Sequence, residues 1–153
     1  LVLLADRGWD SHVILSPTAA TWVDVERLAE VSGHPVRVEP RTPHDPDPLP
    51  AADAIITAPL TFNSLNKWAA GISDTLALGL LNEALGLRLP ITAAPCVKEA
   101  LRQHPAYDSS VETLVAAGVT VLDPERAIIH SQSGDLTLDW PAAIPLLQFE
   151  TPD

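Results

Sequence analysis

Short, uninterrupted apolar runs alternate with helix-type stretches along most of the chain, and this alternation restricts the possible folds more than any other feature. The runs Ala54 to Ala58 and Leu89 to Ala94 are typical of buried strands, whereas Ser64 to Leu85 and Val111 to Ala117 are typical of helices. Strands that are apolar on both faces occur in parallel sheets that helices cover on both sides. The pattern therefore predicts an α/β fold with a doubly wound, Rossmann-like or flavodoxin-like parallel sheet in three layers.

The two ends of the chain add further expected elements. Gly8 is expected to close a first helix in a left-handed conformation. Ser16 or Thr18 is expected to cap a single helix that ends near Gly33. Two alternating runs between Ala127 and Trp140 predict a C-terminal hairpin. Three more short strands are expected at His12 to Ser16, Pro35 to Glu39 and Val119 to Leu122.

Two breaks are expected between these elements. The segment "PRTPHDPDPLP", Pro40 to Pro50, is too rich in proline for a helix or an interior strand and is predicted to be a loop. The long helical stretch is expected to break near Gly71 to Asp74, where Ser73 could cap its second half.

Length, composition and charge exclude several classes of protein. At 153 residues and 46% hydrophobic, the sequence predicts one domain over residues 1–153. The formal net charge of -11 opposes binding to nucleic acid or to an anionic membrane. Cys96 is the only cysteine, and no histidines or cysteines have the spacing of a zinc site, so no metal is expected. No run is long enough to span a bilayer, and we expect a cytoplasmic protein.

The stretch "ITAPLTFNSLNKWAAGIS", Ile56 to Ser73, places a proline, hydroxyls and an amide where a buried strand is followed by a helix. Pro59 is expected to end the strand, and Thr61, Asn63 and Ser64 follow it. Ligands of open parallel sheets bind at the carboxyl ends of the strands, where helix N-termini offer free N–H groups. Two interpretations stay open from these residues alone: the polar side chains cap the helix, or they hold a heterocycle and its phosphate.

The longer stretch "APLTFNSLNKWAAGISDTLALGLL" resembles a segment of the flavin-containing cysteine decarboxylases, which include phosphopantothenoylcysteine decarboxylase and the decarboxylases of lantibiotic maturation. In that family a Pro-Ala-Ser-Ala-Asn-Thr turn precedes Ala-Lys-x-Ala-x-Gly-x-x-Asp-Asn-Leu. The matching residues here are Pro59, Thr61, Asn63, Ser64, Lys67, Ala70, Gly71, Asp74 and Leu76. "GWDSHVILSPTAATWV" and "LPITAAPCVKEALRQHPAYDSSVETLVAAGVTVLDP" are similar to two further family segments. The resemblance therefore extends over most of the chain.

The resemblance implies a domain that binds FMN at a subunit contact and assembles as a homotrimer or a dodecamer of trimers. It implies five cofactor-binding residues, namely Ser16, Thr18, Thr61, Asn63 and Ser64. The turn after Pro95 would close over the flavin ring or the substrate. The sequence contains no methionine and begins at Leu1, and we expect the family's first strand and its glycine/serine loop to precede this residue.

The family's chemistry can be carried over to two residues. In these enzymes the flavin oxidises a cysteine to a thioaldehyde, which then loses carbon dioxide, while a histidine acts as base and a Met-Asn motif holds the carboxylate. His44 lies near the position of that histidine and is the candidate catalytic base, with a solvated loop histidine as the alternative. Lys98 takes the place of the asparagine and is the candidate substrate-binding residue. Cys96 is interpreted as a small buried side chain and not as a reactive thiol.

Three functions are compatible with these residues. The resemblance favours an FMN-dependent enzyme that decarboxylates a small molecule or peptide oxidatively. The alternative is a catalytically inactive, flavoprotein-like subunit that binds or regulates. A flavodoxin-like electron carrier would suit the acidic composition, but the Thr61 turn fits the decarboxylase family better.

Overall fold

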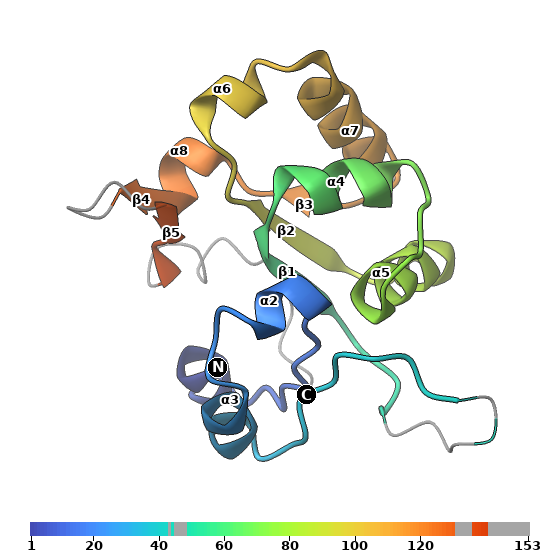
Figure 1. Cartoon of the computed structure of the whole chain (residues 1–153), viewed down its shortest axis with the longest axis vertical. Coiled ribbons are helices and arrows are strands. Elements are labelled where there is room, and N and C mark those ends of the chain that lie inside the picture. The colour runs from blue at the N-terminus through green and yellow to red at the C-terminus, as the bar shows by residue number, and fades with distance from the viewer. Residues whose placement is uncertain (43, 45–48, 131–135, 141–153) are drawn as a thin grey trace.

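A parallel sheet of three strands lies at the centre of the structure, a computed structural model that describes residues 1–42, 44, 49–130 and 136–140 (Figure 1). The strands are β1 (Ile55–Leu60), β2 (Ile91–Pro95) and β3 (Thr120–Val121), in the order β1-β2-β3. Ile55 is aligned with Ile91, and Thr92 is aligned with Thr120. The predicted α/β class with a parallel sheet is confirmed, and each strand lies where an apolar run predicted one.

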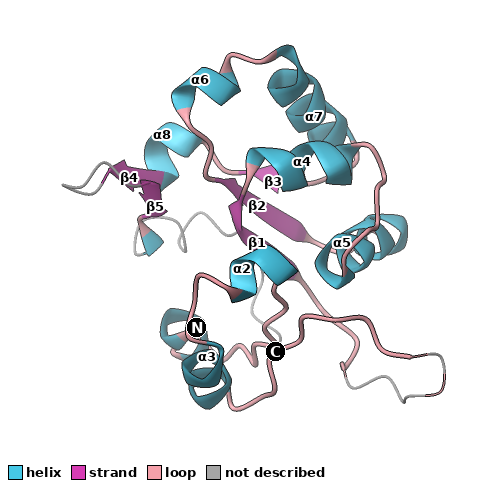
Figure 2. Ribbon diagram, viewed as in Figure 1, coloured by secondary structure: helices cyan, strands magenta, loops and turns pink. Residues whose placement is uncertain are grey.

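Helices connect these strands, as the alternating pattern predicts (Figure 2). α4 (Phe62–Ala69) and α5 (Leu76–Leu87) link β1 to β2, and α6 (Glu99–Arg102) and α7 (Pro105–Ala116) link β2 to β3. The predicted break in the long helical stretch is confirmed, but Thr75, and not Ser73, caps α5. The Thr75 hydroxyl accepts a hydrogen bond from the Leu78 N–H at 3.2 Å.

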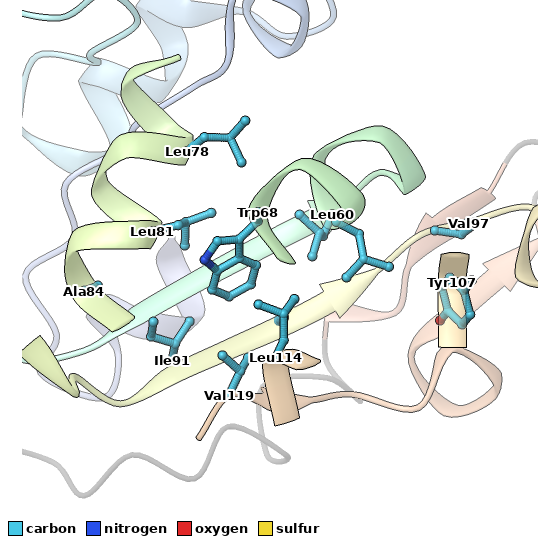
Figure 3. Packing of buried hydrophobic residues seen from close by; sticks show 12 residues of the cluster. Leu60, Trp68, Leu78, Leu81, Ala84, Ile91, Val97, Tyr107, Leu114 and Val119 are labelled. Atoms are coloured by element: carbon cyan, nitrogen blue, oxygen red, sulfur yellow. The ribbon is translucent and has the colours of Figure 1, made fainter. Parts of the chain in front are cut away.

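The hydrophobic core joins the sheet to α4, α5 and α7 (Figure 3). Trp68 of α4 is 1% exposed, and its ring lies among Leu81 of α5, Leu114 of α7 and Ile91 of β2. The middle strand, β2, is buried along its whole length. This packing holds the ends of β1 and β2 in fixed positions relative to each other.

The first forty residues form short helices and almost no sheet. They contain α1 (Val2–Ala5), α2 (Pro17–Ala20) and α3 (Val25–Ser32). The strands predicted at residues 12–16 and 35–39 are reduced to one parallel bridge between Ile14 and Arg37.

The single helix predicted between Ser16 and Gly33 is therefore wrong, since α2 and α3 are separate helices. Asp24 separates them because its extended backbone cannot continue a helix, and its carboxylate accepts a hydrogen bond from the Arg27 N–H at 2.9 Å. The predicted left-handed Gly8 is confirmed, with φ of 82°.

The C-terminal part contains α8 (Pro124–Ala127) and two antiparallel strands, β4 (Ile128–His130) and β5 (Leu136–Leu138). The predicted hairpin is thus confirmed, while its predicted turn at residues 133–135 lies outside the described residues. None of the helices in the described ranges combines the length and apolar character that crossing a membrane requires.

Candidate functional site

Thr61 occupies the junction between β1 and α4. Its backbone is extended, with φ of -76° and ψ of 159°, so it ends the strand and begins the helix. The Thr61 hydroxyl accepts a hydrogen bond from the Ser64 N–H at 3.3 Å and donates one to the Ser64 hydroxyl at 3.1 Å. The capping interpretation is therefore confirmed for this pair, and the remaining N–H groups of the first turn of α4 have no partner within the helix.

Asn63 differs from its neighbours because its amide is not used for capping. It lies in the first turn of α4 and is exposed, while Thr61 and Ser64 on either side of it are half-buried. Within the described part of the chain, its side chain makes no hydrogen bond. Asn63 therefore offers both a donor and an acceptor to a ligand at this edge of the sheet.

The turn after β2 lies directly beside the Thr61 turn. The Cys96 N–H donates a hydrogen bond to the Leu60 carbonyl at 2.9 Å, which joins the carboxyl ends of the two strands. A second contact connects the following residues, because the Phe62 and His104 rings meet edge to face with centroids 5.6 Å apart. Lys98 precedes α6 on this side and is exposed. We call the residues Leu60 to Ser64 and Pro95 to Lys98 the strand-end site.

Cys96 lies within this site, but its thiol is a weak nucleophile. The side chain is half-buried, and this burial raises the pKa of the Cys96 thiol. The thiol is therefore protonated at neutral pH, in agreement with its interpretation as a small packing residue.

Ser16 and Thr18 occupy an analogous position in the first part of the chain. They follow the Ile14 bridge, and the Ser16 hydroxyl caps α2 by accepting a hydrogen bond from the Ala19 N–H at 3.1 Å. Thr18 is exposed. No hydrogen bond between described residues joins α2 to the strand-end site, so the role of Ser16 and Thr18 at the cofactor stays a prediction.

His44 is exposed and lies in a turn within the proline-rich segment. Residues 43 and 45–48 on either side of it lie outside the described part of the chain. Its catalytic role therefore stays a prediction, and no described contact brings it to the strand-end site.

Two of the motif residues have a structural role that the sequence did not reveal. Lys67 at the end of α4 forms an ion pair with Asp74 in the loop before α5. The Asn82 amide also donates to the Ile72 carbonyl at 3.2 Å and to the Ser73 hydroxyl at 2.8 Å. These contacts hold in place the loop that joins α4 and α5. A structural role therefore accounts for Lys67 and Asp74, and neither residue needs a catalytic role.

Sequence analysis assigned no partner to His12 or His34 and predicted no metal-binding cluster. The structure brings these two histidines together with Asp10, with possible ligand atoms within 4.8 Å of one another. The spacing of these three residues in the sequence does not indicate a metal site, because they come from two distant segments that a parallel bridge brings together.

A separate hollow lies at the opposite edge of the sheet. Its lining comes from the end of α5, the end of α7 and the residues before β2 and β3, namely Leu85, Arg88, Leu89, Ala116, Ala117, Gly118 and Val119. Ligands of open parallel sheets bind at the carboxyl ends of the strands, and this hollow is at the amino ends. The strand-end site is therefore the better candidate.

The strand-end site has the composition of a nucleotide- or flavin-type site of an open α/β sheet: free helical N–H groups, hydroxyls, an unused amide and a lysine. A family model described as Flavoprotein matches residues 2–141. The chain belongs to this flavoprotein family, which confirms the class that the sequence motifs predicted.

Known proteins of similar sequence and structure agree with this assignment. The coenzyme A biosynthesis bifunctional protein CoaBC of Thermococcus kodakarensis is 26% identical over 130 residues, which cover 79% of this chain and 31% of that protein. The FMN-dependent cysteine decarboxylase TvaF from thioviridamide biosynthesis is 26% identical, with a TM-score of 0.57, over 75% of this chain and 72% of that one. The epidermin biosynthesis protein EpiD from Staphylococcus aureus has a TM-score of 0.70 at 19% identity, over 95% of this chain and 88% of that one, and shows the shared fold. The chain spans about a third of the length of the CoaBC relatives it matches.

Proposed function

We propose that this chain binds FMN at the strand-end site. The observation that supports the proposal is the Cys96–Leu60 hydrogen bond, because it joins the end of β1, which leads to Asn63, to the end of β2, which leads to Lys98. Membership of the flavoprotein family supports this cofactor. TvaF, a structural relative, is described as an FMN-dependent enzyme.

The residues at the site fit the polar parts of a flavin nucleotide. Thr61 and Ser64 hold the first turn of α4 in place through their mutual hydrogen bonds, so its free N–H groups can receive a phosphate or a ring oxygen. Asn63 can donate and accept at the flavin without giving up a protein contact. Ser16 and Thr18, at the start of α2, supply further hydroxyls.

The reaction we propose is an oxidative decarboxylation of a small molecule or peptide that carries a cysteine. Bound FMN would supply the two-electron oxidation of the substrate. Lys98 would attract the substrate carboxylate, since an exposed ammonium group acts as a point charge. His44 would accept a proton, for which an imidazole is suited near neutral pH.

Assembly and location are part of the same proposal. A homotrimer, or a dodecamer of trimers, would cover large apolar side chains that are exposed on the single chain, such as Trp22 at 64% and Val115 at 51%. The single cysteine is compatible with a cytoplasmic location. The alternative function is a catalytically inactive flavoprotein-like subunit that binds or regulates.

Anaerobic turnover distinguishes the enzyme from the inactive subunit. The FMN-loaded protein is mixed with a peptide that ends in cysteine, or with an acylated cysteine, and flavin absorbance and carbon dioxide are followed. We expect loss of the band near ~450 nm together with carbon dioxide release. For the Lys98→Gln variant, the substrate concentration that gives half the maximal bleaching rate should be about 10-fold higher, and the melting temperature should be unchanged, because its exposed side chain loses only its charge. A loaded protein that neither bleaches nor releases carbon dioxide would favour the inactive subunit.

A further inference from the structure

Asp10, His12 and His34 form a cluster that the proposed flavin chemistry does not use. His34 Nε2 lies 2.6 Å from one carboxylate oxygen of Asp10, and His12 Nε2 lies 3.7 Å from the other. The two imidazole rings stack, with centroids 3.9 Å apart and an angle of 20° between their planes. Two ring nitrogens therefore face the same carboxylate from one side.

Backbone hydrogen bonds bring the segments of His12 and His34 together. The Leu15 N–H donates to the Arg37 carbonyl at 2.8 Å, and the Arg37 N–H donates to the Val13 carbonyl at 3.0 Å. The bridge brings the two segments together at Ile14 and Arg37, shortly after His12 and His34 in the sequence. The two imidazole rings can therefore meet.

The turn that carries His34 is also fixed locally. Gly33 ends α3 with φ of 74°, a left-handed conformation that favours glycine. The Ser32 hydroxyl accepts a hydrogen bond from the His34 N–H at 3.3 Å and donates one to the His34 carbonyl at 3.1 Å. The His34 imidazole is thus held on a short, braced turn.

The three side chains are close to the geometry of a metal site. All three possible ligand atoms lie within 4.8 Å of one another. A tetrahedral zinc ion with bonds of about 2.0–2.1 Å separates its ligand atoms by about 3.3 Å. His34 Nε2 lies 2.6 Å from one Asp10 oxygen and His12 Nε2 lies 3.7 Å from the other, so the exposed carboxylate would have to rotate to present one oxygen at such a separation from both nitrogens.

The three candidate ligands differ in how far their side chains are exposed. The side chains of His12 and His34 are 21% and 30% exposed, whereas that of Asp10 is 73% exposed. The imidazoles are therefore held by packing, and the carboxylate is free to adjust. An exposed aspartate carboxylate is ionised at neutral pH, and so it can act as a ligand.

We propose that Asp10, His12 and His34 bind a divalent transition metal ion, with Zn²⁺ as the expected ion. Two imidazole nitrogens and one carboxylate oxygen suit Zn²⁺, whereas Mg²⁺ and Ca²⁺ prefer sites made of oxygen alone. Three protein ligands leave a coordination position for water. The bound ion would tie the segment before Ile14 to the turn after α3, and so would stabilise the first part of the chain.

Calorimetric titration of tag-free, chelator-treated protein with zinc chloride tests the site. We expect one Zn²⁺ per chain and a melting temperature that rises with zinc concentration, because a ligand that binds the folded state stabilises it. Magnesium chloride should give neither effect. The absence of both heat and a thermal shift up to about 1 mM Zn²⁺ would overturn the proposal.

Single substitutions test whether the zinc ion binds at these three residues. His34→Asn and Asp10→Asn should each weaken zinc binding at least about 10-fold, since each removes one of three ligands. His104→Asn is the matched control: it removes a histidine elsewhere, and asparagine can replace the ring nitrogen that caps α7. Asp10 is exposed, so its variant should fold, which circular dichroism verifies. Equal zinc affinity in the Asp10→Asn variant and the control would contradict the assignment.

Discussion

Replacing Trp68 by alanine is expected to lower the free energy of unfolding by about 3–5 kcal/mol. The indole is 1% exposed and lies where α4, α5, α7 and the sheet meet. Its removal would leave a cavity whose lining comes from three helices and β2, and such a lining cannot collapse without moving whole elements. Urea unfolding followed by circular dichroism measures the change.

Trp68→Phe is the matched control for this prediction. The indole N–H of Trp68 is buried and has no hydrogen-bond partner among the described residues, so phenylalanine removes no hydrogen bond. Only part of the ring volume is lost, and the expected cost is about 1–2 kcal/mol. Equal losses for the two variants would mean that the buried ring volume does not determine the cost, contrary to this view of the core.

The second large effect concerns the cofactor. Asn63→Ala is expected to weaken FMN binding about 10- to 100-fold, because a buried polar group of the ligand would lose its partner. The stability of the protein without flavin should hardly change, since Asn63 is exposed and makes no hydrogen bond to the described residues. Quenching of FMN fluorescence during titration gives the affinity, and thermal unfolding gives the stability.

Glu112→Ala serves as the control because Glu112 is also exposed, but on α7. Its FMN affinity should equal that of the unchanged protein. If the Asn63→Ala and Glu112→Ala variants bind FMN equally well, Asn63 is not a cofactor ligand. The strand-end site would then lack its strongest candidate for a hydrogen bond to the flavin.

The central strands could be predicted from sequence because their signal is local. The apolar runs at residues 54–58 and 89–94 are continuous, and continuous apolar runs are typical of parallel strands. In the structure β2 is buried along its whole length, while β1 is mostly half-buried. The position of the candidate site followed from the same pattern, since a polar turn after a buried strand marks a carboxyl edge.

Other features depended on competition between neighbouring residues. Several hydroxyl and carboxylate side chains near each helix start can cap it, and the backbone conformation decides which one does. Asp24 and Thr75 therefore cap α3 and α5, while the sequence favoured Ser16 or Thr18 for one long helix and Ser73 for the other.

The contacts between the segments around Ile14 and Arg37 could not be predicted from the sequence. The strands expected around Ile14 and Arg37 extend no further than one bridge, because a short strand depends on partners that its own sequence does not specify. That bridge brings together the two segments that carry Asp10, His12 and His34. A single sequence contains no record of this pairing.

The most direct test of the central claim is the absorbance spectrum of the purified chain before and after addition of FMN and removal of the unbound flavin. We expect retained bands near ~370 and ~450 nm, with about one FMN per chain released on denaturation and identified by mass. A chain that is folded by circular dichroism, colourless as purified and unable to retain added FMN would contradict flavin binding at the strand-end site.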